Sequence, residues 1–199
     1  MAQELELKAI VPDPIALRGR LVGANARSGF RGLMEDRRYD REGTLAARDE
    51  VLRTRRFVPA DGPIEAELTW KGPTRRSADG YKLREELTSR VTPGSDSPGA
   101  ILEALGYTVV QAIDRWVELF EVGGAVLRIE WYPRMDVLLE VEGAPEAIER
   151  AIRASGLPRE AFSADMLVDF VRRYDARGAR PAVLAVTGLA GERPAWETA

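Results

Sequence analysis

Charged side chains recur at every second residue in several segments of this sequence. Glu4, Glu6 and Lys8 open the chain in this way, and Glu140 and Glu142 repeat the spacing near the other end. A spacing of two places such side chains on one face of an extended strand. Carboxylates on one face can bind a hard cation such as Mg²⁺ or Mn²⁺, and arginines or lysines can bind phosphate oxygens. The other charged positions in strand-like segments are Arg53, Arg55, Lys71, Lys82, Arg84, Glu86, Arg115, Arg128 and Glu130.

The sequence contains neither cysteine nor histidine, which narrows the chemistry further. Disulfides, thiolate chemistry and cysteine metal sites are excluded. A Ser-His-Asp triad, an imidazole base and histidine-bound zinc are excluded as well. The cations are almost all arginine, and the lysines Lys8, Lys71 and Lys82 each fall in a strand-like segment beside other charged residues. Since a compact ammonium and a guanidinium are not equivalent at a crowded phosphate site, this placement favours phosphate binding.

Length and composition are those of a soluble, globular, single domain. The chain has 199 residues, of which 45% are hydrophobic and 31% charged, and its net charge is −3. We expect one domain over residues 1–186 and a flexible tail over 187–199. The charge argues against a nucleic-acid partner, and the lack of a long apolar run or signal peptide argues against a membrane one. A cytoplasmic location is the default expectation.

Alternation and turn signals predict about eight strands and several helices. The predicted strands cover residues 3–11, 33–39, 51–58, 64–71, 81–91, 107–121, 125–131 and 136–142. The predicted helices cover 14–22, 98–106, 145–154 and 163–176, and loops are expected at 23–32 and 72–80. Gly123 and Gly124 have the pattern of a hairpin turn.

Short turns between neighbouring strands favour an antiparallel sheet, and eight such strands can close into a barrel. Any one charged strand face is typical of an ordinary sheet with a solvated side. The predicted helices, however, need the opposite, apolar faces to pack on, which turns the charged faces inward. An interior lined by both signs of charge cannot be a dry core. We therefore expect an α+β fold, an eight-stranded and largely antiparallel closed β-barrel with peripheral helices, holding a polyphosphate with Mg²⁺ or Mn²⁺.

The opening Glu4-Leu5-Glu6-Leu7-Lys8 resembles the ExExK motif of the CYTH, or triphosphate tunnel metalloenzyme, family. Further segments resemble that family in the same order: Met34–Asp40, Leu52–Arg56, Leu68–Pro73, Lys82–Glu86, Leu105–Tyr107 and Leu139–Gly143. The order and spacing hold from residue 4 to about 175. The apolar spacers of the first motif and the LTWKGP and REE segments look most like the class IV adenylate cyclase branch.

The resemblance implies a role for each matched position. The implied metal ligands are Glu4, Glu6, Glu140 and Glu142. The implied triphosphate-binding residues are Lys8, Arg53, Arg55, Lys71, Lys82, Arg84, Arg115 and Arg128. Lys8, Glu130 and Glu86 are the implied catalytic group, in which Glu86 orients its basic neighbours. Two positions depart from the family pattern, because Val117 replaces a second basic residue and Thr88 a further glutamate.

The resemblance implies an adenylate cyclase that converts ATP to cyclic AMP and pyrophosphate. An inorganic tripolyphosphatase or thiamine triphosphatase is the alternative, and a non-catalytic polyphosphate- or nucleotide-binding module is a second one. Each has a small-molecule triphosphate as its partner. The sequence leaves open whether the protein forms a homodimer.

Overall fold

The computed structural model describes the backbone of residues 2–92 and 97–199, and the side chains of these ranges from Leu5 onward. Its strands are β1 (Ala2–Ile10), β2 (Arg27–Asp40), β3 (Val51–Pro59), β4 (Glu65–Lys71), β5 (Arg75–Arg76), β6 (Lys82–Val91), β7 (Thr108–Val122), β8 (Ala125–Trp131) and β9 (Leu138–Glu142). Its helices are α1 (Pro14–Gly23), α2 (Pro98–Ala104), α3 (Pro145–Ser155) and α4 (Leu167–Arg177).

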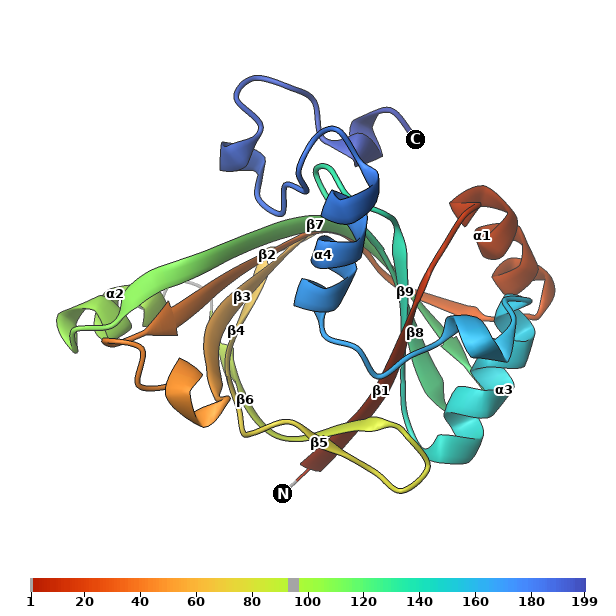
Figure 1. Cartoon of the computed structure of the whole chain (residues 1–199), viewed down its shortest axis with the longest axis horizontal. Helices are drawn as coiled ribbons and strands as arrows, with labels where there is room; N and C mark the ends of the chain where they lie inside the picture. The colour runs from red at the N-terminus through yellow and green to blue at the C-terminus, as the bar shows by residue number, and fades with distance from the viewer. Residues whose placement is uncertain (1, 93–96) are drawn as a thin grey trace.

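The strands form a closed antiparallel barrel (Figure 1). The sheet order is β1-β9-β8-β7-β2-β3-β4-β6, and β6 pairs with β1 to close the ring. β5 is a short strand that pairs with the first two residues of β6. Gly123 and Gly124 form the β7–β8 turn, and both have positive φ, which glycine adopts without strain. The predicted fold, an α+β protein with an eight-stranded closed barrel, is confirmed.

The main apolar core lies outside the barrel wall, beneath α1 and α3. Leu7, Leu127 and Leu139 come from the strands, and Leu17 and Ile148 come from the two helices. All five are buried. Asp13 caps α1 by accepting a hydrogen bond from the Ala16 N–H, as the Asp-Pro signal predicts. Because the apolar faces of β1, β8 and β9 are used in this core, their charged faces point into the barrel.

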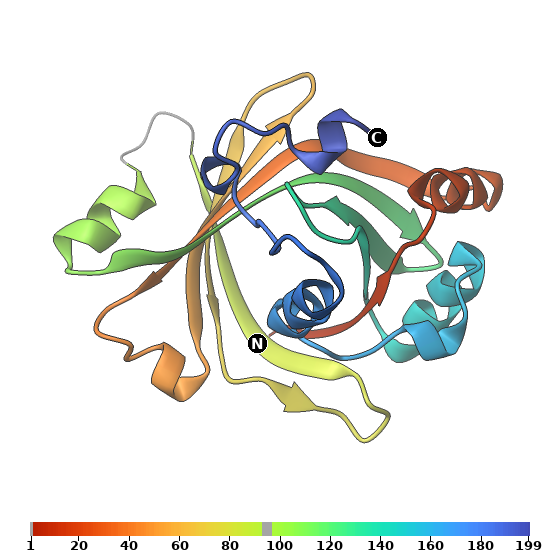
Figure 2. The same cartoon turned by 45° about the horizontal axis from the view of Figure 1, so that its top comes forward.

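A second apolar cluster lies at one end of the barrel, where α4 covers part of the opening (Figure 2). Phe170 of α4 packs with Ile113, Tyr132 and Leu138 of the wall region. The segment before α4 is fixed to β1, because the backbones of Ser163 and Lys8 exchange two hydrogen bonds.

Three element predictions are wrong in their bounds. The expected loop at 23–32 contains the start of β2, where Arg27 and Ser28 already pair with β7 across a bulge. The expected loop at 72–80 contains β5. The last helix begins at Leu167, not at residue 163, because the Ser163 backbone is bonded to β1 and is extended.

The segment expected as a flexible tail contains short helical turns at Val186–Gly188 and Ala195–Glu197. Leu189 is buried, and the Ala195 N–H donates to the Pro133 carbonyl. Its flexibility stays a prediction. Among the residues that the structure describes, no helix has the length and apolar character needed to cross a membrane.

Candidate functional site

A cavity of about 970 Å³ lies inside the barrel, and residues of all eight barrel strands line it. Its basic lining residues are Lys8, Arg38, Arg53, Arg55, Lys71, Lys82, Arg115 and Arg128. Its acidic lining residues are Glu6, Asp36, Glu67, Glu86, Glu130, Glu140 and Glu142. Leu167, Val168 and Val171 of α4 form an apolar part of the wall. The cavity is therefore a charged chamber with an apolar cover at one end.

The structure brings most of the predicted site residues into this one cavity. Arg84 is the exception among those with described side chains. It is buried, but its guanidinium donates to the backbone carbonyls of Gly72 (2.7 Å) and Asp49 (2.6 Å). The backbone of Glu4 pairs with that of Arg84, while the Glu4 side chain lies outside the described residues. The binding roles of all these residues remain predictions.

The ammonium group of Lys8 lies between a carboxylate of β1 and one of β9. It donates to Glu6 at 2.8 Å and forms an ion pair with Glu140. Lys82 also binds Glu6, and Arg128 also binds Glu140. Burial opposes the ionisation of Glu6, but Lys8, Lys82 and Lys71 hold its pKa well below the usual value. Burial and the charge of Lys8 lower the pKa of Lys82 to about 8.

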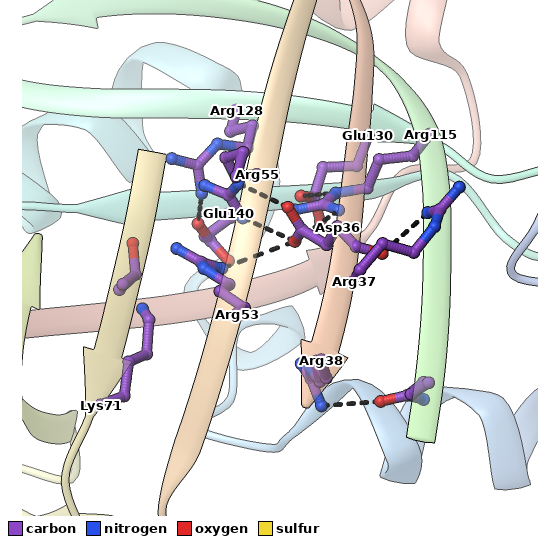
Figure 3. A network of polar contacts seen from close by, with 12 residues as sticks. Asp36, Arg37, Arg38, Arg53, Arg55, Lys71, Arg115, Arg128, Glu130 and Glu140 are labelled. Carbon is purple, nitrogen blue, oxygen red and sulfur yellow. Dashed lines mark hydrogen bonds and ion pairs between the residues drawn. The ribbon is translucent and has the colours of Figure 1, made fainter. Parts of the chain in front are cut away.

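Asp36 is the centre of a second cluster, in which it contacts three arginines (Figure 3). Arg55 donates to both carboxylate oxygens, at 2.7 and 2.8 Å, and Arg115 donates to Oδ2 at 3.1 Å. Arg53 lies 3.5 Å from the same oxygen. Burial would raise the pKa of Asp36, but the charges of Arg55, Arg115 and Arg53 hold it well below the usual value.

Sequence reasoning gave Asp36 no role, although the residue lies in the segment Met34–Asp40 that carries part of the family resemblance. The signal was the alternation of Met34, Asp36 and Arg38, which places Asp36 on the inner face of its strand.

Glu130 joins this cluster to a tyrosine that sequence reasoning also missed. It accepts hydrogen bonds from Arg115 Nε at 2.6 Å and from the Tyr132 hydroxyl at 2.8 Å. Burial opposes the ionisation of Glu130, but Arg115, Arg128 and Lys8 keep its pKa below the usual value. Burial and the charge of Glu130 raise the pKa of Tyr132, so the hydroxyl stays protonated and remains a donor. Tyr132 lies two residues after Glu130, at the spacing that already marks the inner face.

Several buried donors in the cavity wall have no partner among the residues that the structure describes. They are the Nε atoms of Arg38, Arg53 and Arg128. The Arg53 guanidinium also lies 3.8 Å from Glu86, which is beyond a strong hydrogen bond. Because an unpaired buried donor is costly, an anion that accepted these hydrogen bonds would be stabilised.

The glutamates of β1 and β9 are suitable ligands for a divalent metal that binds together with an anion. Glu6 faces Glu142 across β1 and β9, and Lys8 faces Glu140. Within the described side chains, no three acidic groups are gathered closely enough to hold a metal by themselves. Mg²⁺ commonly binds one or two carboxylates and completes its shell with water and substrate phosphates. The oxygen ligands present therefore fit a metal that shares its coordination with a phosphate ligand.

The two departures from the family pattern also have clear places. Val117 is fully buried, and its backbone pairs with that of Glu130. The hydroxyl of Thr88 lies 3.0 Å from Glu86 and 3.2 Å from the Thr69 hydroxyl. Arg128 faces inward and lines the cavity, so it supplies a positive charge near the position of Val117.

No protein-family model matches the sequence, and no curated protein is significantly similar to it. Solved structures with the same fold are numerous. A Vibrio parahaemolyticus protein named "putative adenylate cyclase" is 19% identical, with a TM-score of 0.71, and the match covers 85% of this chain and 97% of that one. A Pyrococcus horikoshii protein is 22% identical, with a TM-score of 0.69 and 85% and 98% coverage.

A Hippeastrum protein, named "putative adenylyl cyclase" and described as having a dominant triphosphatase activity, is also similar. It is 16% identical, with a TM-score of 0.59, and the match covers 91% of this chain and 98% of that one. At these identities the likeness establishes the fold. The chain therefore shares the closed eight-stranded barrel fold of these proteins.

Proposed function

We propose that this protein is a divalent-metal-dependent enzyme that acts on a triphosphate inside its barrel, and that its reaction is the conversion of ATP to cyclic AMP and pyrophosphate. One observation carries the proposal. Eight basic and seven acidic side chains from all eight strands line one cavity of about 970 Å³. Such a lining is stable only when it is wet or filled by a charged guest. A metal-bound triphosphate carries both signs of charge and suits this lining.

The arginines and lysines would hold the phosphate oxygens. A phosphate could accept hydrogen bonds from the buried Nε–H groups of Arg53 and Arg128 without displacing a described protein partner. Lys8 would leave Glu6 and Glu140 to bind the phosphate, since a lysine ammonium is a mobile point charge. Glu86 contacts Lys71 at 2.7 Å and Arg53 at 3.8 Å, which supports a role in orienting these two cations.

Glu6, Glu140 and Glu142, with Glu4, are the residues that would hold Mg²⁺ or Mn²⁺. A metal bound there would neutralise phosphate charge and lower the pKa of an attacking hydroxyl. The absence of histidine makes such activation the natural substitute for an imidazole base.

In the cyclase reaction, the ribose 3′-oxygen forms a bond to the α-phosphorus. The bond between the α-phosphorus and the oxygen that bridges it to the β-phosphorus breaks. Pyrophosphate leaves, and the 3′-hydroxyl proton is lost to solvent. The contribution of this chain is to position the phosphates and to neutralise the leaving group. Lys8, Arg53 and Arg128 are the proposed contacts, and Glu130 keeps Arg115 in place.

Hydrolysis of tripolyphosphate or thiamine triphosphate is the second candidate, with water as the nucleophile. The activity named for the similar Hippeastrum protein favours it. A binding module without turnover is the third candidate, because Val117 and Thr88 remove charges that the family pattern contains.

A paired assay separates these candidates. The protein is incubated with ATP and Mn²⁺ and assayed for cyclic AMP, and then with tripolyphosphate and Mn²⁺ and assayed for phosphate. Cyclic AMP with equimolar pyrophosphate supports the cyclase. Phosphate from tripolyphosphate without cyclic AMP supports the hydrolase and overturns the cyclase. Stabilisation by tripolyphosphate without turnover supports the binding module.

A further inference from the structure

We infer that Asp36 is a positioning residue that fixes the spacing of three arginines in the cavity, and that it thereby favours a chain of phosphates over a shorter anion. The inference rests on the triphosphate-directed function proposed above and assigns a residue to its selectivity. Asp36 is 1% exposed and lies in the interior wall, midway between β3 and β7.

The pairing of the strands brings the three arginines to Asp36. Arg55 faces Asp36 directly across β2 and β3. Arg53 lies one inward position further along β3, and Arg115 one inward position along β7, where it faces Met34. Three guanidinium groups from two strands therefore meet one carboxylate (Figure 3).

The contacts of Asp36 differ from those of the other cavity carboxylates. Its Oδ1 accepts from Arg55 Nε, and its Oδ2 accepts from Arg55 and Arg115. Such a fork-shaped pair fixes the guanidinium plane as well as its position. Glu6 is paired with two lysines, whose ammonium groups impose no plane. Asp36 is therefore suited to hold arginines in place, and Glu6 to exchange its partners for a metal.

The fixed arginines keep donors available for a ligand. The pair with Asp36 uses one edge of the Arg55 guanidinium, and the remaining N–H groups are not bonded to Asp36. Arg53 lies 3.5 Å from Asp36 and 3.8 Å from Glu86, and within the described part of the chain its Nε has no hydrogen-bond partner. An array with fixed spacing matches successive phosphate groups better than separate, mobile arginines would.

A purely electrostatic role for Asp36 predicts the opposite change in anion affinity when the carboxylate is removed. Removing a negative charge beside three arginines would strengthen the binding of any anion. Positioning predicts weaker binding of a long phosphate chain, because the arginines lose their spacing. The variant Asp36→Asn keeps the size of the side chain and removes its charge, so it separates the two roles.

The matched control is Asp114→Asn on the outer face of β7. Asp114 is also buried, and it accepts from Arg37 at 2.7 Å and from the Val186 N–H at 2.9 Å. Calorimetric titration of each protein with tripolyphosphate and with pyrophosphate gives the dissociation constants, with Ca²⁺ in place of Mg²⁺ to slow turnover. Thermal unfolding of both variants shows how much stability each one loses.

Asp36→Asn is expected to weaken tripolyphosphate binding about tenfold or more and pyrophosphate binding by about threefold or less. The preference for tripolyphosphate therefore falls, while Asp114→Asn leaves both constants within about twofold of the wild type. Equal or tighter tripolyphosphate binding by Asp36→Asn, with an unchanged preference, overturns the inference alone. Failure of the wild type to bind tripolyphosphate overturns both the proposed function and this inference.

A measurement on the wild type covers the case in which Asp36→Asn does not fold. NMR spectra of the arginine Nε–H groups, assigned with Arg→Lys variants, are recorded without ligand. The Arg55 and Arg115 signals are expected to be sharp and slowly exchanging, since both Nε atoms donate to buried carboxylates. Signals that exchange as fast as that of the exposed Arg56 would contradict a fixed array.

Discussion

Glu6 and Glu142 lie directly opposite each other on β1 and β9, and both line the cavity. Two like charges at facing positions destabilise a sheet unless a cation lies between or beside them. Lys8 and Lys82 both form ion pairs with Glu6 and supply this positive charge. A divalent metal is the proposed replacement when a triphosphate binds the lysines.

The first prediction concerns these carboxylates. Glu142→Gln and Glu4→Gln are each expected to lower the rate of metal-dependent turnover by about 100-fold or more, because each removes a proposed charged metal ligand. Steady-state assays over a range of Mn²⁺ concentrations give the measurement. Glu121→Gln is the control, since Glu121 is an exposed partner of Arg27 and is not among the described residues that line the cavity. Full activity in both glutamine variants would remove these residues from the metal site.

A second prediction concerns Arg53, whose buried Nε has no hydrogen-bond partner among the described side chains and backbone. Arg53→Gln is expected to raise KM for the triphosphate by about tenfold or more, because a charge-assisted phosphate contact is lost. Arg56→Gln is the control on the same strand, since Arg56 is exposed and paired with Glu35. An unchanged KM for Arg53→Gln would mean that the unpartnered donor does not meet the substrate.

The third prediction concerns acid stability. Three arginines keep the pKa of buried Asp36 well below that of an unfolded chain. The ionised carboxylate thus contributes stability above the unfolded pKa of about 4, and this contribution is lost as pH falls toward the folded pKa. Urea unfolding of wild type and Asp36→Asn should differ by about 3–5 kcal/mol at pH 7.

That difference should shrink below about pH 4, because the unfolded wild type then takes up a proton that the folded protein does not. A difference that stays constant from pH 7 down to about pH 3 would contradict an ionised, arginine-bound Asp36. The Asp114→Asn variant is the control. It shows how much unfolding free energy is lost when a buried carboxylate on the outer face is neutralised.

The fourth prediction concerns the hydroxyl of Tyr132, which donates to buried Glu130 at 2.8 Å. Tyr132→Phe leaves a charged acceptor short of one donor, so it should lower the free energy of unfolding by about 1.5–3 kcal/mol. Tyr81→Phe removes a hydroxyl bonded to the partly exposed Glu149 and should cost less. Chemical denaturation of both variants tests the order, and a larger loss for Tyr81→Phe would contradict it.

Much of the fold follows from local patterns. The two-residue alternation around Glu4–Lys8 and Glu140–Glu142 placed the charged faces, and the need of the helices for apolar surface turned those faces inward. The start of β2 escaped detection because Gly29 and Gly32 interrupt its alternation. Only the pairing with β7 shows that Arg27 and Ser28 are already extended.

The candidate site shows where local patterns stop being sufficient. Asp36 has an ordinary place in its own strand, and its three arginines come from β3 and β7. Its importance depends on which strands flank β2, and a spacing rule cannot supply that. Arg84 shares a face with Lys82, yet its longer side chain ends at the carbonyls of Gly72 and Asp49. A spacing of two fixes the face of a side chain and leaves the position of its end group open.

The most direct test is calorimetric titration of the wild-type protein with tripolyphosphate in the presence of a divalent metal. The structure predicts one tripolyphosphate per barrel, bound more weakly when the metal is chelated and more weakly again in Glu142→Gln. No saturable binding of tripolyphosphate, with or without metal, would contradict the assignment of this charged cavity to a triphosphate.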